Sequence, residues 1–376
     1  MKVAQIIDSL KWGGAQKMVL TLVQQLCDRR IPVTVISLSD DADTDLAQQI
    51  RALGVTTHHL GGRLLNLGRI QRLVTVLKQE SVTLAHTYLT YANIIGVFAA
   101  RAAGVPVIAS LRSAGRDPRH YHPLRYHMET YTLTRMASAV MANGHAIAEV
   151  HQQRLGDRPI VVIPNAVALP PLPSAAERQR QRAVWFSDPT RPVLISVGRF
   201  SPPKGQADLL QAFAQLRERL PQAALVFVGD GETRAAVEAQ AGQLGLSDDV
   251  RFLGARSDVP ALLPLADIFV SPSHWEGLSV ALLEALAAGL PIVATKVGDA
   301  PRVVSTDVGS LVSPKDPTAL ANALHTLLTH PSRCAAAAQA ARSRAASQFG
   351  LDTWTNRLLK LYAQVSPTFQ EALSRE

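Results

Sequence analysis

Two glutamates lie eight positions apart in the chemically most informative stretch of the chain, residues 274–289. Glu284 falls within an expected helix that is apolar on nearly all sides, which is typical of a buried helix. A buried carboxylate needs hydrogen-bond donors, and the hydroxyl groups of a polyhydroxylated ligand would supply them to Glu284 and Glu276. The alternative is that Glu284 pairs with a structural arginine and that Glu276 is solvated.

The start of this helix is an expected phosphate site. Ser279 suits the N-cap position, and Gly289 with Pro291 marks the end of the helix. Backbone N–H groups at a helix N-terminus attract anions, and the helix dipole adds to this attraction. The amides of Gly277, Leu278 and Ser279 are therefore expected to face a phosphate.

Two cations stand in a second loop, Gly198–Gly205, which follows an expected strand. Arg199 can bind a phosphate through two parallel hydrogen bonds, and Lys204 supplies a compact positive charge. Pro202 and Pro203 stiffen the backbone between them. The spacing predicts a diphosphate site, and a merely solvated loop is the alternative.

The first half of the chain holds less specific signals. Gly13 and Gly14 follow the first expected strand, where they either let the backbone approach a ligand or form a plain tight turn. His86 is expected to end a strand and to enter a cleft, with a structural histidine as the alternative. Asn165 ends another strand and is either a site residue or a turn residue.

Residues 112–135 form a basic, aromatic stretch in which arginine, histidine and tyrosine far outnumber acidic residues. Such a stretch suits an anionic membrane surface or a phosphorylated acceptor, and a solvated face is the alternative. The residues assigned to this contact are Arg112, Arg116, Arg119 and Arg125.

Short apolar runs alternate with helical patterns along the whole chain, which predicts α/β domains with doubly wound parallel sheets. Residues 164–192, which are rich in proline, separate two such series, and residues 177–182 within them are expected to be a solvated turn of helix. Ligands of these folds bind beyond the carboxyl ends of the strands, where the loops described above lie. The expected strands are 3–7, 33–37, 82–85, 106–110, 139–142 and 160–163, then 193–197, 224–228, 250–253, 267–271 and 291–295.

Composition narrows the class of protein further. A length of 376 residues favours two domains, and two distant cysteines exclude a disulfide framework or a cysteine-based metal site. No set of side chains has metal-ligand spacing, and no signal peptide or membrane-spanning apolar run is found, which favours a cytosolic location with at most peripheral membrane contact. A net charge of +8 favours anionic partners. Nucleic acid is the weakest of these, because the basic residues are dispersed and no reader motif accompanies them.

Taken together, these loops resemble the family-4 (group 1) retaining glycosyltransferases over nearly the whole chain. Four motifs occur in the family's order: Gly13-Gly14-Ala15, Ile163-Pro164-Asn165, the loop 197–205, and the pair Glu276 and Glu284. The resemblance implies the GT-B fold, in which two Rossmann-like, doubly wound domains face each other across a deep interdomain cleft. Residues 1–168 would form the acceptor domain, with a C-terminal helix of about 352–376 packing back onto it, and residues 169–351 would form the sugar-nucleotide donor domain.

The resemblance also implies roles for single residues. Arg199 and Lys204 would hold the donor diphosphate, Glu284 would hold the ribose, and Glu276 with Gly277, Leu278, Ser279 and Val280 would hold the sugar and a phosphate. Gly13, Gly14 and Asn165 would complete the donor site, and His86 would lie near the transferred sugar. Catalysis is assigned to Glu276, His86, Arg199 and Lys204. Retention of the anomeric configuration is implied, with no metal or other cofactor.

The resulting hypothesis is a retaining hexosyl- or N-acetylhexosaminyl-type transferase that uses a nucleotide-diphosphate sugar, expected to be a UDP-sugar. The expected acceptor is a hydroxyl of a lipid-linked molecule or a polysaccharide precursor. A sugar-nucleotide epimerase of the same fold and a catalytically idle subunit of a glycan-assembly complex are the alternatives, and the complete motif set disfavours both. Arg302 stands where the family usually has glutamate, which bears on sugar and acceptor preference.

Overall fold

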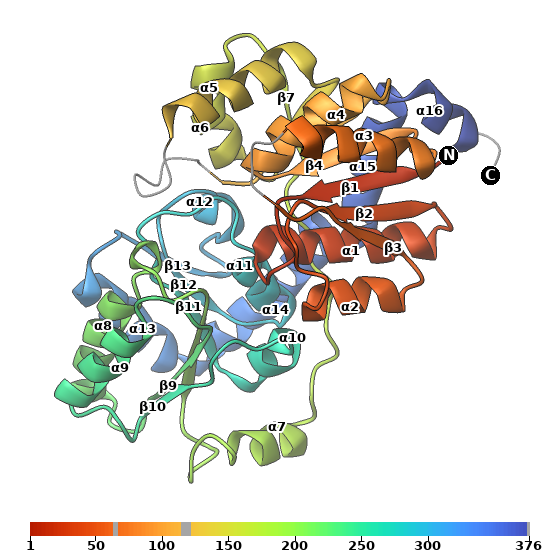
Figure 1. The fold of residues 1–376 in the computed structure, drawn as a ribbon. Coiled ribbons are helices and arrows are strands. Elements are labelled where there is room, and N and C mark those ends of the chain that lie inside the picture. The colour runs from red at the N-terminus through yellow and green to blue at the C-terminus, as the bar shows by residue number, and fades with distance from the viewer. Residues whose placement is uncertain (63–66, 114–121, 374–376) are drawn as a thin grey trace. The chain divides into compact units, whose positions relative to one another are not determined.

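The computed structural model describes residues 1–62, 67–113 and 122–373, and it divides into two compact units (Figure 1). Unit 1 comprises Met1–Asn165 and Leu351–Glu376, and unit 2 comprises Ala166–Gly350. The division after Asn165 has a local cause, because Val167 pairs in parallel with Gly350 and so belongs to unit 2.

Unit 1 is built on a seven-stranded sheet in the order β3-β2-β1-β4-β5-β6-β7, with all neighbouring strands parallel. This order places β1 near the middle, with crossovers running to both sides, as in a doubly wound Rossmann-like domain. The strands are β1 Val3–Ile7, β2 Val33–Ser37, β3 Thr56–His59, β4 Leu84–Tyr88, β5 Val107–Leu111, β6 Ala139–Ala142 and β7 Ile160–Val162.

Helices cover both faces of this sheet. On one face, Leu77 of α3 and Ile147 of α6 share a buried cluster with Ile6 and Val107 of the strands. On the opposite face, Tyr362 of α15 contacts side chains of β1 and β4. The helices are α1 Gly14–Asp28, α2 Asp45–Ala52, α3 Leu67–Gln79, α4 Val97–Ala102, α5 Pro123–Tyr131, α6 His145–Leu155, α15 Leu351–Val365 and α16 Pro367–Leu373, with π-helical η1 Ala92–Gly96 and η2 Thr132–Met136.

One expectation about the strands of unit 1 was wrong, and one strand was not expected. The strand expected at 82–85 begins at Leu84 and continues to Tyr88, so His86 is its third residue and does not end it. The strand β3 was not expected, because its sequence Thr-Thr-His-His has no apolar run.

Unit 2 repeats the same architecture with a six-stranded parallel sheet in the order β10-β9-β8-β11-β12-β13. The strands are β8 Val193–Val197, β9 Ala224–Val228, β10 Val250–Phe252, β11 Ile268–Ser271, β12 Ile292–Thr295 and β13 Gly309–Val312, of which only β13 was not expected. The helices are α7 Ala175–Arg182, α8 Gln206–Arg219, α9 Arg234–Gln243, α10 Val259–Leu262, α11 Val280–Ala287, α12 Ala300–Val303, α13 Pro317–Leu328 and α14 Pro331–Phe349, with 3-10 turns η3 Pro202–Lys204 and η4 Leu263–Leu265. The two sheets confirm the doubly wound α/β prediction.

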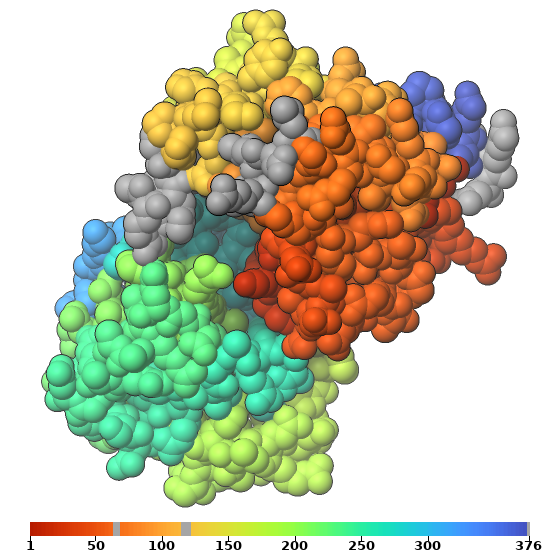
Figure 2. All heavy atoms as spheres, viewed as in Figure 1, coloured from red at the N-terminus to blue at the C-terminus, as the bar shows by residue number. Residues whose placement is uncertain are grey.

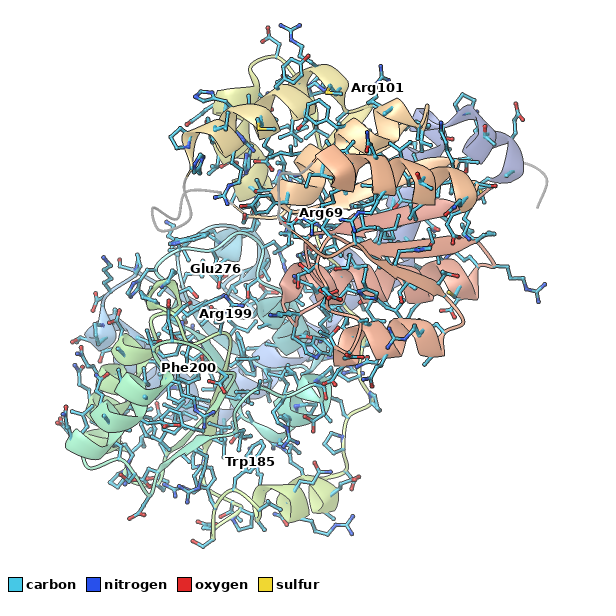
Figure 3. All side chains as sticks on the ribbon, viewed as in Figure 1. Arg69, Arg101, Trp185, Arg199, Phe200 and Glu276 are labelled. Carbon is cyan, nitrogen blue, oxygen red and sulfur yellow. The ribbon has the colours of Figure 1, made fainter. Side chains whose placement is uncertain are left out.

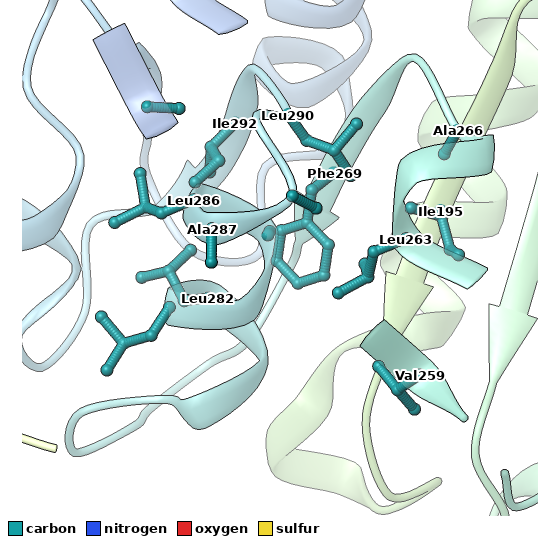
Figure 4. Close-up of a cluster of buried hydrophobic side chains, with 14 of the residues drawn as sticks. Ile195, Val259, Leu263, Ala266, Phe269, Leu282, Leu286, Ala287, Leu290 and Ile292 are labelled. Atoms are coloured by element: carbon teal, nitrogen blue, oxygen red, sulfur yellow. The ribbon is translucent and has the colours of Figure 1, made fainter. Parts of the chain in front are cut away.

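The core of unit 2 lies on both faces of its sheet, because successive strand residues point to opposite sides. Phe269 and Ile292 pack against Leu282 and Leu286 of α11, as Figure 4 shows. Val270 faces the other way and joins a second cluster with side chains of α8 and α13. This packing holds α11 with its N-terminus at the carboxyl end of β11, where the expected phosphate site lies.

The expected solvated helical turn at residues 177–182 is confirmed except at its last residue. These residues belong to α7, and its Arg182 is buried. Arg182 Nη2 lies 2.6 Å from one carboxylate oxygen of Asp267, and Arg178 Nη2 lies 2.7 Å from the other. The two arginines therefore fasten α7 to the start of β11 within unit 2.

No helix in the described ranges is both long and apolar enough to span a lipid bilayer.

Candidate functional site

The loop between β8 and α8 carries Arg199 and Lys204 beyond the carboxyl end of a central strand of unit 2. Phe200 anchors this loop, because its ring is buried and lies 5.7 Å from the ring of Phe227 and 6.1 Å from that of Phe252. The neighbouring Arg199 side chain stays exposed, and Figure 3 labels it together with Glu276. The local fold thus directs a buried aromatic ring inward and a guanidinium outward.

Lys204 and Glu276 contact each other directly. Lys204 Nζ donates a hydrogen bond to Glu276 Oε1 within an ion pair, and Ser273 Oγ donates to the same oxygen at 3.0 Å. The two side chains that the sequence assigned to the diphosphate and to the sugar are therefore partners within unit 2. Any anion that binds Lys204 meets a carboxylate already in place.

Further contacts join the two loops that carry this pair. The backbone N–H of His274 donates to the carbonyl oxygen of Pro203 at 2.7 Å, and His274 Nε2 lies 2.7 Å from Asp208 Oδ2 at the start of α8. Gly205 has a φ of +66°, and a Cβ atom there would lie 2.2 Å from the Pro272 carbonyl oxygen. Only glycine permits this close approach of the loops.

The N-terminus of α11 lies where the sequence predicted it. Ser279 occupies the N-cap position, but its hydroxyl makes no capping hydrogen bond, so the expected side-chain cap is absent. Glu284 lies on this eight-residue helix and is only 6% exposed, as expected for a buried carboxylate.

A third loop, between β12 and α12, packs against the start of α11. The backbone N–H of Asp299 donates to the Gly277 carbonyl oxygen at 3.2 Å. Gly298 has a φ of +54°, and a Cβ atom there would lie 2.3 Å from the Glu276 carbonyl oxygen. Arg302 follows on α12, where its Nη1 lies 3.7 Å from Asp299 Oδ1.

In unit 1, Gly13 is the N-cap residue of α1, and the first turn of this helix has no acidic residue. Gly13 and Gly14 are both exposed, which suits the expected approach to a ligand. A Cβ atom at Gly13 would lie 2.5 Å from Gln16 Oε1, so the Gln16 side chain folds back over the loop.

His86 does not reach a surface, contrary to the expectation from sequence. It is fully buried, and its Nδ1 lies 2.7 Å from the Tyr362 hydroxyl and 3.0 Å from the Tyr88 hydroxyl. Tyr88 donates in turn to Gln5 Oε1 at 2.8 Å. Burial, together with the charge of Arg112, holds the pKa of His86 well below its ordinary value, so the imidazole is neutral.

Of the four basic residues assigned to an acceptor or membrane contact, Arg112 and Arg125 are described, whereas Arg116 and Arg119 lie outside the described residues. Arg112 Nη1 donates to Asn165 Oδ1 at 2.8 Å, so two residues from different sequence motifs meet within unit 1. Arg125 Nη1 donates to the Tyr91 hydroxyl at 3.0 Å.

Sequence reasoning missed Asp8, which follows β1 and precedes the glycine pair. Its carboxylate accepts hydrogen bonds from the backbone N–H groups of Ala92 at 2.6 Å and of Tyr91 at 3.2 Å, at the start of η1. Burial raises its pKa to about 7. An acidic residue directly after the first strand was the available signal. Within the described ranges, no three side chains of histidine, cysteine, aspartate or glutamate gather as metal ligands would.

Comparisons with known proteins place this geometry in a family. Residues 177–344 match the family model described as glycosyl transferases group 1, and residues 12–169 match glycosyltransferase family 4. The 2-deoxystreptamine glucosyltransferase of Streptomyces kanamyceticus is 31% identical over 293 residues, which cover 73% of this chain and 75% of that protein. The chain belongs to the group 1, family 4 retaining glycosyltransferases.

Two further similar proteins align over different shares of their length. A GDP-mannose-dependent alpha-(1-6)-phosphatidylinositol monomannoside mannosyltransferase of Mycolicibacterium smegmatis is 34% identical over 194 residues, and the alignment spans about half of each protein. The crystal structure of Anabaena HepE in complex with UDP-glucose is 25% identical, with a TM-score of 0.85 over 97% of this chain and all of that one. The two-sheet architecture is therefore the GT-B fold of this family.

Proposed function

We propose that this protein is a retaining glycosyltransferase that moves a sugar from a UDP-sugar to a hydroxyl group of a lipid-linked or polysaccharide-precursor acceptor. The observation that carries the proposal is the direct Lys204–Glu276 contact beside Arg199 and the start of α11, at the carboxyl edge of the unit 2 sheet. Residues 169–351 would bind the donor, and residues 1–168 with the helix at 352–376 would bind the acceptor.

In this proposal, unit 2 contributes to catalysis by electrostatic stabilisation of the departing diphosphate. As the bond between sugar and diphosphate breaks, negative charge develops on the departing phosphate. Arg199, Lys204 and the α11 amides from Gly277 to Val280 supply positive charge and N–H donors that lower the energy of that state. Glu284 accepts hydrogen bonds from the ribose hydroxyls, and Glu276 accepts one from the sugar. The departing phosphate oxygen takes the proton of the acceptor hydroxyl on the same face of the sugar, so no protein nucleophile is needed.

The relatives support the two substrate classes to different degrees. HepE was solved with UDP-glucose, which supports a UDP-linked donor, whereas the mycobacterial relative uses GDP-mannose. That relative acts on a phosphatidylinositol mannoside, which supports a lipid acceptor. The Streptomyces kanamyceticus relative is named for 2-deoxystreptamine, so a small polar acceptor is the competing class.

A donor-by-acceptor matrix tests the proposal. The purified full chain is incubated with UDP-, GDP- and ADP-sugars, each with a short prenyl diphosphate glycolipid and with 2-deoxystreptamine, and products are analysed by mass spectrometry and proton NMR. A UDP-sugar and the lipid-linked acceptor are expected to give a product with the donor's anomeric configuration. Inversion of that configuration would contradict the retaining assignment.

The same matrix separates the two alternatives. Conversion of the sugar nucleotide to its epimer without an acceptor would show that the protein is an epimerase and not a transferase. Nucleotide binding without any turnover across the matrix would identify an idle binding subunit. Failure of every nucleoside diphosphate to bind would reject the donor site itself.

We also propose that α5 makes peripheral contact with an anionic membrane. The side chains of Leu124 and Tyr131 on this helix are 58% and 55% exposed, and Arg135 just beyond them is exposed and positively charged. The yellow segment that includes α5 lies at the surface in Figure 2. Apolar side chains beside a cation suit the headgroup region of an anionic bilayer.

Sedimentation with vesicles tests this contact. The full chain is expected to sediment with phosphatidylglycerol vesicles more than with phosphatidylcholine vesicles, and Leu124→Ser with Tyr131→Ser should reduce the bound fraction. Val184→Ser is the control, because Val184 is 84% exposed in unit 2. Equal sedimentation of the wild type and the double variant would contradict the assignment of α5.

A further inference from the structure

We propose that Arg112, Ser110, Asn143 and Asn165 form a phosphate-binding site made entirely of unit 1 residues. This inference rests on the proposed function for its ligand, which is a phosphate group carried by one of the two substrates. It differs from the unit 2 site, whose cations are Arg199 and Lys204.

Among the residues that the structure describes, the guanidinium of Arg112 has only neutral partners. Its Nε donates to Ser110 Oγ at 3.0 Å, its Nη1 donates to Asn165 Oδ1 at 2.8 Å, and its carbon centre lies 4.8 Å from the centre of the Tyr88 ring. Its Nη2 is buried and has no hydrogen-bond partner in the described part of the chain. No carboxylate among the described residues forms an ion pair with Arg112.

A buried cation without a counter-charge is costly, so arginines of this kind are normally paired. The neighbouring titratable groups do not supply the missing charge. His86 is neutral, because burial and the charge of Arg112 lower its pKa. Burial raises the pKa of both Tyr88 and Tyr362, so both phenols remain protonated. The positive charge of Arg112 is therefore not balanced by any described neighbour, and a bound anion would compensate it.

The position of the four residues is that of a ligand site in a doubly wound sheet. Ser110 lies at the carboxyl end of β5, and Asn143 and Asn165 follow β6 and β7. The backbone N–H of Asn143 donates to the Leu111 carbonyl oxygen at 3.2 Å, and that of Asn165 donates to the Asn143 carbonyl oxygen at 3.2 Å. Three neighbouring strand ends thus converge, at the edge where such folds bind ligands.

A second polar side chain at this edge also lacks a partner. Asn143 is only 5% exposed, and its Oδ1 is buried without a hydrogen bond. The oxygen and nitrogen of an amide can exchange places by a half-turn, so this group can offer N–H donors to an anion. Arg112 as a whole remains partly exposed, which gives a ligand a route to the guanidinium.

This geometry favours a substrate phosphate over a membrane surface as the partner of Arg112. A guanidinium with one nitrogen buried among strand-end residues cannot lie flat against lipid headgroups. Its fork of N–H donors suits a phosphate, which accepts two parallel hydrogen bonds. The phosphate belongs either to a lipid-linked acceptor or to the donor, and these sources have the same chemistry at the site.

Calorimetric titration of the full chain distinguishes the sources. One arm titrates UDP, and the other titrates geranyl phosphate, with geraniol as the blank, into protein already saturated with UDP. The variants are Arg112→Gln and Arg112→Lys, and the control is Arg101→Gln, an exposed unit 1 arginine on α4 (Figure 3). Near-ultraviolet circular dichroism establishes that each variant is folded, and Arg112→Lys serves if Arg112→Gln is not.

The expected result is that wild type binds geranyl phosphate but not geraniol, and that Arg112→Gln weakens this binding at least tenfold with UDP affinity unchanged. Arg112→Lys should fall between them, because it keeps the charge but loses the fork. A tenfold loss of UDP affinity instead would support the site with the donor as the source. Unchanged binding of both ligands in folded variants would overturn the site. Absence of UDP binding in the wild type would instead reject the proposed function, and geranyl phosphate titrated alone would still test Arg112.

Discussion

The Lys204 ammonium and the Glu276 carboxylate neutralise each other in unit 2, and this pairing bears on how a diphosphate binds there. Both groups are mostly buried, so their attraction is less screened than that of a surface pair. A bound diphosphate must share Lys204 with the carboxylate. If the proposed site binds a nucleotide, Glu276 therefore opposes its ground-state binding, although the proposed function needs Glu276 for transfer.

Replacement of Glu276 should separate binding from turnover. In Glu276→Gln, the carboxylate no longer competes for Lys204, so UDP affinity is expected to rise about threefold to tenfold, up to about 1.4 kcal/mol. Transfer should fall at least a hundredfold. Titration calorimetry and a transfer assay measure the two effects, with Glu218→Gln, an exposed α8 position, as the control. Weaker UDP binding in Glu276→Gln would contradict this account of the pair.

The raised pKa of Asp8 leads us to expect that the stability of the fold depends on pH. The pKa of Asp8 is about 7 in the folded protein, chiefly because of burial, against an ordinary pKa of 3.8 for an aspartate side chain. Between these values the folded state keeps a proton that the unfolded state has released, so the free energy of unfolding falls as pH rises from about 4 to about 7. The loss is on the order of 4 kcal/mol, at 1.36 kcal/mol per pH unit.

Denaturant unfolding at several pH values measures this effect. Asp8→Asn has no proton to release, so its free energy of unfolding should decline less between pH 4 and pH 7 than that of the wild type. Asp157→Asn, at an exposed unit 1 position, should keep the wild-type slope. If the free energy of unfolding changed equally with pH in Asp8→Asn and the wild type, the raised pKa of Asp8 would not be the cause of the pH dependence.

At the scale of elements, the site depends on two loops held together by contacts far apart in sequence. The β8–α8 loop and the loop before α11 are joined by the Asp208–His274 contact and by the bond from His274 N–H to the Pro203 carbonyl. Lys204 lies in the first loop and Glu276 in the second. Movement of one loop relative to the other would therefore separate the two functional groups.

A double-mutant cycle tests whether this connection positions the site. Asp208→Asn and His274→Gln should each weaken UDP binding, and the double variant should weaken it by less than the sum, with a coupling of about 1 kcal/mol. The same cycle on Arg256 and Asp258, an exposed unit 2 ion pair, should leave UDP affinity unchanged. Strict additivity for Asp208 and His274 would mean that their contact does not position the loops.

At the scale of the whole molecule, local patterns predicted most elements but not the contacts between distant ones. The apolar sequence around Glu284 correctly indicated a buried helix, and continuous apolar runs located all strands except β3 and β13. The burial of Arg182 depends on Asp267, and that of His86 depends in part on Tyr362, which is 276 residues away. No local signal reports such partners, because they meet only after the sheets have formed.

The positions of the candidate-site loops were predictable from the order of strands and helices. Arg199, Lys204 and Glu276 follow parallel strands, and the carboxyl ends of parallel strands lie on one edge of a sheet. The direct pairing of Lys204 with Glu276 was not predictable, because it depends on the path of each loop. The Arg112–Asn165 contact is another case, since the residues were assigned to different ligands.

The central claim is that the β8–α8 loop and α11 of unit 2 bind the diphosphate and ribose of a nucleotide. Calorimetric titration of UDP into the wild type, Lys204→Ala and Glu284→Ala tests it most directly, with circular dichroism to establish folding. The account predicts binding by the wild type and at least a tenfold loss of affinity in each folded variant. Equal UDP affinity in all three proteins, or no binding by the wild type, would contradict it.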